Sequence, residues 1–202
     1  MAKYDANLVV IGAGSGGLVS ALIAAAVKSK VILIERHKMG GDCLNTGCVP
    51  SKALIRSSRI KRYLDRAGEF GIEGGSSRVD FPAVMRRVQS VIRQIEPHDS
   101  VERYTELGVD CLQGKATIVS PWEVKVGDQV HSARRIILAS GGRPFIPDIP
   151  GIDSVPQLHS DNVWQLEHLP TLAVPSYLRN VLNPSYAGLS MPGGAFNWTR
   201  PS

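Results

Sequence analysis

The sequence predicts an α/β protein with a doubly wound parallel sheet. Three observations carry this prediction: a β-branched run at residues 8–11, an alanine-rich apolar segment at residues 18–27, and a second apolar run at residues 31–34. Short apolar runs are typical of strands that are buried on both faces. Because a strand, a glycine-rich turn, a helix and a strand follow in this order, we expect a Rossmann-like fold.

The composition is that of a folded globular chain. Hydrophobic residues make up 43% of the 202 residues, charged residues make up 20%, and 23 Lys and Arg against 18 Asp and Glu leave a net charge of +5. A chain of this length buries a core without a disulfide or metal staple. Three cysteines do not make the disulfide framework of a small secreted protein.

Residues 6–27 carry no charge, which raises the alternative of a membrane span. Gly12, Gly14, Gly16 and Gly17 interrupt the segment, and it lacks the basic start and continuous apolar stretch of a secretory signal. We therefore expect a buried strand, turn and helix, no membrane association and a cytoplasmic protein.

The glycines match the pattern G-x-G-x-x-G at Gly12, Gly14 and Gly17. In such a turn the first glycine permits the tight bend, the second lets a pyrophosphate approach the backbone, and the third lets the helix pack closely on the strand. The N-terminus of the following helix offers free N–H groups and a partial positive charge to the phosphates.

Glu35 ends the second strand, at the distance where a carboxylate accepts hydrogen bonds from a ribose. The alternative is an ordinary solvated strand end. Arg36 follows directly and would tolerate a ribose phosphate, so the acid does not define which dinucleotide binds.

Residues 40–52 read GGDCLNTGCVPSK and contain Cys43 and Cys48. The two thiols could form half of a metal site, with His37 as a third ligand, or a disulfide. Structural zinc needs about four ligands. Since Cys111 is far along the chain and no second Cys/His cluster exists, we expect no metal site.

A disulfide here requires a break in the helix. In a regular helix, residues five apart have Cα atoms about 8 to 9 Å apart, whereas a disulfide needs them within about 7 Å. Asn45 and Gly47 are residue types that permit a departure from helical geometry. Pro50 then fits the first turn of a new helix, whose N-terminus and Lys52 would both favour a thiolate at Cys48.

Residues 40–52 resemble the active-disulfide signature of the flavin-dependent pyridine nucleotide-disulfide oxidoreductases, which include dihydrolipoamide dehydrogenase, glutathione reductase and mercuric reductase. Asp42 and the run at residues 44–47 are most similar to mercuric reductase-like members. The resemblance continues over residues 109–142, where an apolar strand leads into an Ala-Ser-Gly turn in place of the family's Ala-Thr-Gly-like turn.

The resemblance implies a domain that binds FAD. It places the ADP half at Gly12, Gly14, Gly17 and Glu35. The other positions expected at the cofactor are Arg36, Gly41, Asp42, Lys52, Ala116, Ala139, Ser140 and Gly141.

The resemblance also implies catalytic roles for Cys43, Cys48 and Lys52. NADH or NADPH would pass a hydride to FAD, and the reduced flavin would open the Cys43–Cys48 disulfide through Cys48. Cys43 would then attack a substrate disulfide or ligate a substrate metal ion, while Lys52 lies near the reactive nitrogen of the flavin. Dihydrolipoamide, another disulfide and a mercuric ion use the same dithiol, so the substrate stays open.

We expect a FAD-binding domain at residues 1–150, with a small antiparallel insertion around residues 110–134. Residues 151–174 would be a connector and the start of a truncated NAD(P)-binding domain. Residues 175–202 contain no acidic residue, and the second glycine-rich turn and the dimerisation domain of the homodimeric family are missing.

We interpret the tail as the result of a shifted reading frame or a broken gene near Val174; the alternative is a naturally short chain with a flexible end. Two functions therefore stay open: an oxidoreductase of the family type, or an incomplete, non-catalytic flavin-binding module.

Two weaker features have plain interpretations. Residues 52–66 hold six Lys or Arg against one Asp, but interleaved apolar positions indicate one packed and one solvated face, so we expect no nucleic-acid binding. Cys111 lies in an apolar strand pattern and is expected to be a small core residue.

Overall fold

A six-stranded sheet in the order β3-β2-β1-β6-β5-β4 forms the centre of the fold. This computed structural model describes residues 4–73, 77–148 and 150–170. The chain divides into two units, one made of residues 1–53 and 87–164 and the other of residues 54–86 and 165–202. The predicted tail at residues 175–202 lies outside the described residues.

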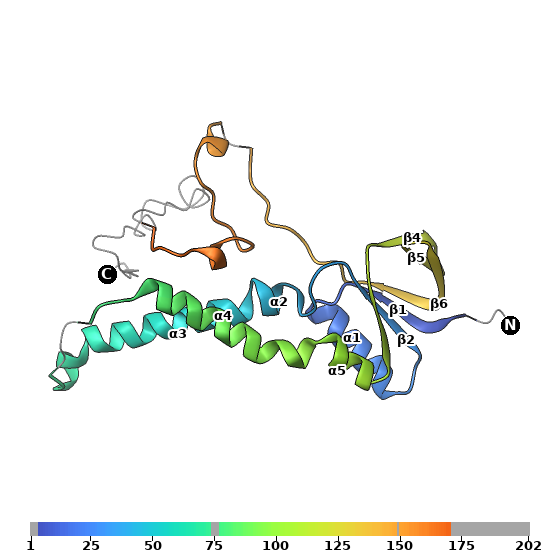
Figure 1. Ribbon diagram of the computed structural model, residues 1–202, viewed down its shortest axis with the longest axis horizontal. Helices are drawn as coiled ribbons and strands as arrows, with labels where there is room; N and C mark the ends of the chain where they lie inside the picture. The colour runs from blue at the N-terminus through green and yellow to red at the C-terminus, as the bar shows by residue number, and fades with distance from the viewer. Residues whose placement is uncertain (1–3, 74–76, 149, 171–202) are drawn as a thin grey trace. The chain divides into compact units, whose positions relative to one another are not determined.

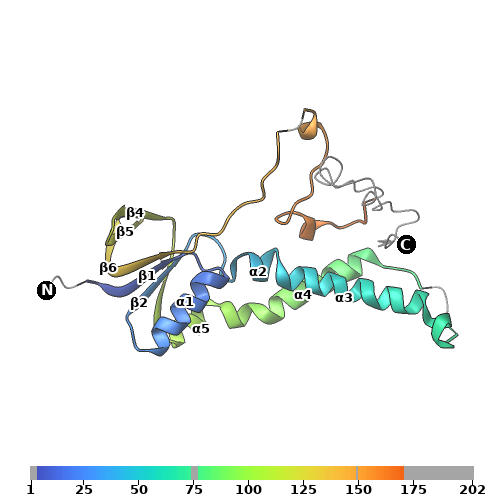
Figure 2. The ribbon, with the colours of Figure 1, turned by 180° about the vertical axis from the view of Figure 1, so that it is seen from behind.

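The elements follow the chain as Figures 1 and 2 show. The strands are β1 (Ala6–Ile11), β2 (Val31–Glu35), β3 (Val109–Gln113), β4 (Ala116–Ser120), β5 (Glu123–Val126) and β6 (Gln129–Leu138). The α-helices are α1 (Ser15–Ala26), α2 (Gly41–Asn45), α3 (Cys48–Asp65), α4 (Phe81–Ile95) and α5 (Val101–Glu106). Short 3-10 turns cover Ala67–Phe70, Glu96–Asp99, Ile152–Ser154 and Val163–Gln165.

The two strands that the sequence predicts first, β1 and β2, pair in parallel, and β3 and β6 extend this parallel arrangement on either side. Leu8 of β1 is in register with Val31 of β2, Val31 with Val109 of β3, and Ala6 of β1 with Ala133 of β6. The carboxyl ends of β1, β2 and β6 therefore meet at one edge of the sheet. This arrangement confirms the Rossmann-like α/β prediction.

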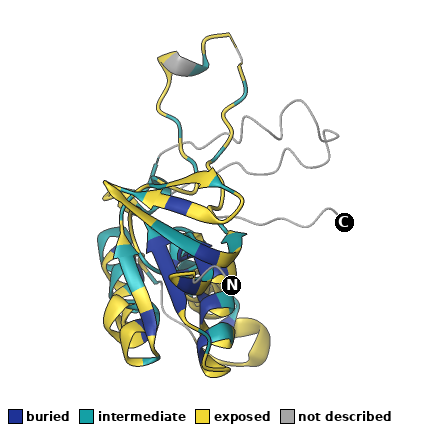
Figure 3. Ribbon diagram, turned by 90° about the vertical axis from the view of Figure 1, so that its right-hand side faces the viewer, coloured by how far each residue is buried: buried dark blue, intermediate teal, exposed yellow. Residues whose placement is uncertain are grey.

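Each face of the sheet has its own apolar core. Figure 3 shows buried residues in the central strands and in the helix beside them. On one face α1 and α5 cover the strands, through residues such as Leu18 and Tyr104 packed with Leu33. On the other face the antiparallel strands cover Val9 and Ile34 with Val124. Because side chains alternate along a strand, consecutive residues of β2 serve both cores, which explains its unbroken apolar sequence.

The antiparallel insertion differs in its bounds from the expected residues 110–134. The segment 109–113 is β3 of the parallel sheet, and the insertion begins at Ala116. The last strand of the insertion continues without a break into the parallel strand that leads to the turn at residues 139–141. The two form one element, β6, which pairs antiparallel with β5 at its start and parallel with β1 afterwards. No glycine or proline interrupts residues 129–138, so nothing ends the strand between the two pairings.

The second unit contains α3 from Leu54 onward, the turn after it and the start of α4. The two helices run alongside each other in Figures 1 and 2. Ion pairs Lys61–Asp65 and Arg66–Glu69 join neighbouring turns on exposed surface. Residues 84–95 belong to α4, and Val88 is fully buried. Across the described residues no helix is both long and apolar enough to cross a membrane.

Candidate cofactor cavity and cysteine pair

The turn after β1 runs against the end of β6. Gly12 has φ +101, and its N–H donates to the Ile34 carbonyl (2.8 Å). A Cβ at Gly12 would lie 2.3 Å from the Ala139 carbonyl oxygen. Both the backbone conformation and the space therefore require glycine at this position.

Gly17 and Gly14 have different surroundings. A Cβ at Gly17 would lie 1.8 Å from the Gly12 carbonyl oxygen, so this glycine lets α1 pack on the turn. At Gly14, which precedes α1 in an extended conformation, the nearest atom would be the Gly41 Cα at 3.8 Å. The N-cap residue Gly14 has no side chain to cap α1, which leaves the first N–H groups of the helix to other acceptors, as at helix ends that bind phosphates.

Glu35 holds the turn in place. The Ala13 N–H donates to Glu35 Oε2 (2.7 Å), and the His37 N–H donates to Oε1 (2.8 Å). A carboxylate offers about four lone-pair sites, so each oxygen keeps capacity for a further donor. The sequence analysis predicted the ligand contact of Glu35 but missed this structural role, which requires the position of Ala13 in space.

A cavity of about 460 Å³ opens at the carboxyl edge of the sheet. Six of the residues predicted at the cofactor line it together: Gly12, Glu35, Arg36, Ala116, Ser140 and Gly141. Gly14, Gly17, Gly41, Asp42, Lys52 and Ala139 are not among the residues that line this cavity.

The sequence analysis missed two cations of the cavity wall, Lys115 and Arg143. Together with Arg36 they line the cavity with three cations against the single carboxylate of Glu35, which gives it a positive lining suited to an anionic ligand. Their places in the sequence could have indicated them, because each lies next to a residue predicted at the cofactor. Lys115 directly precedes Ala116, and Arg143 follows the turn at Gly141.

The cysteine segment breaks between two helices, as predicted. Helix α2 ends at Asn45, Thr46 has φ −136, and α3 begins at Cys48 with Pro50 in its first turn. A Cβ at Gly47 would lie 2.8 Å from the Asp42 carbonyl oxygen, so the tight junction requires glycine there.

The same segment sits directly on the glycine turn. The Gly40 N–H donates to the Ala13 carbonyl (2.9 Å), and a Cβ at Gly41 would lie 2.5 Å from the Gly14 Cα. Gly41 also has φ +53, a backbone conformation that favours glycine. A glycine at this position therefore permits both the start of α2 and the close approach to Gly14. The glycine turn and the cysteine pair are thus neighbouring parts of one unit.

The two predicted redox cysteines lie within hydrogen-bonding reach of each other, and all three cysteines of the chain are free thiols. The bond to Cys48 and partial burial raise the pKa of Cys43, while the Ser15 hydroxyl opposes the shift. Cys48 is exposed, and Lys52 is exposed one turn further along α3. Burial also raises the pKa of Cys111, which packs against the core under α1 as expected.

These environments predict how fast each thiol of the reduced protein reacts with iodoacetamide. Exposed Cys48 should react first and half-buried Cys111 last. Because the pKa of Cys43 is raised, its thiolate population at a given pH is smaller than that of an ordinary cysteine, and its rate should keep rising to higher pH. Peptide mapping across a pH series measures this; a Cys43 midpoint equal to that of a model peptide thiol would contradict it.

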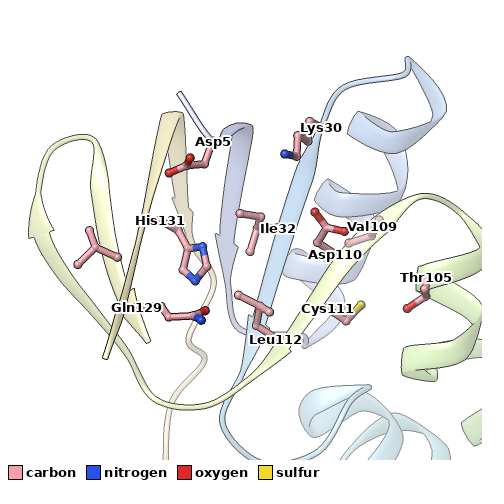
Figure 4. Close-up of a pocket in the computed structure, with 11 residues that line it drawn as sticks. Asp5, Lys30, Ile32, Thr105, Val109, Asp110, Cys111, Leu112, Gln129 and His131 are labelled. Atoms are coloured by element: carbon pink, nitrogen blue, oxygen red, sulfur yellow. The ribbon is translucent and has the colours of Figure 1, made fainter. Parts of the chain in front are cut away.

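A larger cavity, of about 630 Å³, lies at the opposite edge of the sheet (Figure 4). Asp5, Lys30 and Val109, at the beginnings of three strands, line it with His131 of β6. Ligands of open α/β sheets bind outside the carboxyl ends of the strands, which favours the smaller cavity as the cofactor site. In the described part of the chain no three His, Cys, Asp or Glu side chains are grouped to hold a metal ion.

Comparison with known proteins decides the family. Residues 6–180 match the family described as "Pyridine nucleotide-disulphide oxidoreductase". The chain belongs to this family. This agrees with the resemblance that the sequence indicated.

Three relatives illustrate the range of pyridine nucleotide-disulphide oxidoreductases similar to this chain. A mercuric reductase of Bacillus cereus is 29% identical over 189 residues, which are 94% of this chain and 29% of that protein. A dihydrolipoyl dehydrogenase of Chlamydia pneumoniae is 39% identical (81% and 36%). A glutathione reductase of Nostoc is 32% identical (74% and 32%). The chain thus spans about a third of the length of these relatives.

A solved structure shares the fold of this chain. It is the Cu(II) complex of the HOCl-induced flavoprotein disulfide reductase RclA from Escherichia coli, with a TM-score of 0.66 and 24% identity. The match covers 81% of this chain and 34% of that one. At this identity the likeness supports the Rossmann-like fold alone.

Proposed function

We propose that this chain is the FAD-binding and dithiol part of an NAD(P)H-dependent oxidoreductase that acts on a disulfide or a mercuric ion. The observation that carries the proposal is the cavity at the carboxyl edge, which six of the residues predicted at the cofactor line together. The substrate would be dihydrolipoamide, another disulfide or a mercuric ion, which all use such a dithiol. From family membership we also propose that the whole protein binds NAD(P)H and forms a homodimer.

The residues present fit FAD. A Cβ at Gly14 would meet only the Gly41 Cα within 4 Å, so a pyrophosphate could approach the backbone of the turn, and three cations line the cavity that Gly12 of the same turn also lines. Glu35 would accept from ribose hydroxyls with the lone pairs that Ala13 and His37 leave free. When bound, FAD would supply two-electron transfer between a nicotinamide donor and the disulfide.

The two cysteines would have different roles in the reaction, which follow from the raised pKa of Cys43 and the exposure of Cys48. Cys43 holds its proton more tightly than an ordinary thiol, so it must lose that proton before it attacks a substrate disulfide. The Ser15 hydroxyl favours the ionised form of Cys43 and would stabilise the thiolate once formed. Cys48, at the first turn of α3, would take the flavin-side role, with the Lys52 cation on the same helix.

The direct test is the visible spectrum of the purified full chain after incubation with FAD and gel filtration. Yellow protein that bleaches on addition of NADH or NADPH supports the enzyme. Yellow protein that does not bleach favours the alternative of a non-catalytic flavin-binding module. Protein that emerges colourless and shows no FAD binding in a titration contradicts the proposal.

Glu35→Ala should weaken FAD binding by about 10- to 100-fold, the effect of losing one or two hydrogen bonds to a charged group. Fluorescence titration with FAD measures the change. Glu106→Ala, on exposed α5 surface, is the matched control and should bind like the unchanged chain. Equal affinity of both variants would exclude Glu35 from the ligand site.

A further inference from the structure

The connector after β6 returns to the cysteine segment through one tryptophan. The Trp164 indole N–H donates to the Thr46 carbonyl (2.9 Å), a contact between residues 118 positions apart. Thr46 is the C-cap residue that follows α2, between Cys43 and Cys48. Its carbonyl belongs to a helix end, where orphan acceptors need partners from outside the helix.

Helix α4 holds this contact from the other side. The Gln89 side-chain amide donates to the Trp164 carbonyl (3.2 Å), and Arg87 Nη1 donates to the Ala53 carbonyl on α3 (2.9 Å). The junction between the two cysteine-bearing helices is therefore tied to α4 through Trp164, and the start of α3 is tied to α4 directly. These groups all belong to the first unit of the chain.

We propose that Trp164 is a positioning residue that sets the equilibrium between the Cys43–Cys48 disulfide and the dithiol. The inference rests on the proposed redox function of this pair. A disulfide forms only when the two Cα atoms lie within about 7 Å, so the angle of the Thr46 junction controls how readily the thiols reach each other. Without the indole donor the junction gains freedom, and closing the disulfide becomes less favourable.

The equilibrium is measured against glutathione. Two thiols of the chain and one glutathione disulfide give the intramolecular disulfide and two molecules of reduced glutathione; the chain loses two electrons and two protons, which the glutathione disulfide takes up. The full chain is equilibrated in buffers with different ratios of reduced to oxidised glutathione, the exchange is quenched with acid, and the free thiols are alkylated. Mass spectrometry then gives the fraction of the chain that holds the disulfide.

Trp164→Phe should shift this equilibrium toward the dithiol by about three- to tenfold, the effect of one lost hydrogen bond. Trp122→Phe is the matched control, since Trp122 lies between β4 and β5 against Tyr4. It should leave the equilibrium unchanged. Gln89→Leu, which removes the amide that holds Trp164, should shift it in the same direction by less, and it serves as the test if Trp164→Phe does not fold.

Tryptophan fluorescence gives a second readout. Reduction of the disulfide should change the emission of the unchanged chain and of Trp122→Phe, and this change should disappear in Trp164→Phe. Equal equilibria in the unchanged chain, Trp164→Phe and Gln89→Leu would overturn the inference while leaving the redox pair in place. An unchanged chain that forms no Cys43–Cys48 disulfide in any buffer would instead contradict the proposed function, and the inference with it.

Discussion

Gly17→Ala is expected to lower the free energy of unfolding by at least about 3 kcal/mol, because the added methyl group has no space. Its Cβ would stand 1.8 Å from the Gly12 carbonyl oxygen, and the obstacle is backbone, which cannot rotate away as a side chain can. Relief requires α1 to move off the turn that joins it to β1, where Leu18 and Ala21 are buried in the core. Urea unfolding followed by circular dichroism measures the loss.

Two neighbouring glycines provide matched controls. Gly16→Ala meets only the Ala139 Cβ, at 4.0 Å, and should be neutral or stabilise α1 by up to about 1 kcal/mol. Gly14→Ala meets nothing closer than 3.8 Å and should also fold normally. Its methyl group would occupy the space proposed for the pyrophosphate, however, so FAD binding should fall by at least about tenfold.

The three variants separate packing from ligand binding. A Gly17→Ala chain as stable as the unchanged one would contradict the close contact between α1 and the turn. A Gly14→Ala chain that folds and binds FAD with unchanged affinity would place the cofactor elsewhere. Because both variants add the same single methyl group within one turn, a general loss of stability cannot account for a selective loss of binding by Gly14→Ala.

The first strand, the turn, the helix and the second strand could be predicted because residues close together in the sequence determine each of them. Consecutive apolar residues make a strand that is buried on both faces, and glycines at fixed offsets mark the turn. The break between α2 and α3 could be predicted for a different reason: a regular helix holds Cys43 and Cys48 too far apart for a disulfide. A chemical requirement thus defined a backbone feature that propensity alone would not show.

What could not be predicted depends on contacts between distant residues. The cavity wall gains Lys115 and Arg143 only because β3 and β6 end at the same edge as β2. The bond from Trp164 to Thr46 joins residues 118 apart, and no periodicity or motif marks either partner. The length of β6 was also missed, because one strand pairs with β5 and then with β1, so its two halves read as separate strands.

Cys48→Ser is expected to abolish the redox chemistry of the pair. The oxidised unchanged chain should show one free thiol, that of Cys111, when denatured without reductant, and three after reduction. Cys48→Ser and Cys43→Ser should each show two thiols in both states, because neither can close the intramolecular disulfide. With FAD bound, dithionite should reduce the unchanged chain with two equivalents, one for flavin and one for the disulfide, and each variant with one.

Cys111→Ala is the control for this experiment, since Cys111 lies on β3, packs against the core under α1 and is not part of the predicted disulfide. It should take up two equivalents of dithionite like the unchanged chain and release two thiols on reduction. The thiol count does not require bound flavin, so it tests the pair even if FAD is lost on purification. A Cys48→Ser chain that still consumes a second equivalent would mean that the second electron acceptor is not this disulfide, because the remaining thiols, Cys43 and Cys111, lie on separate elements, α2 and β3.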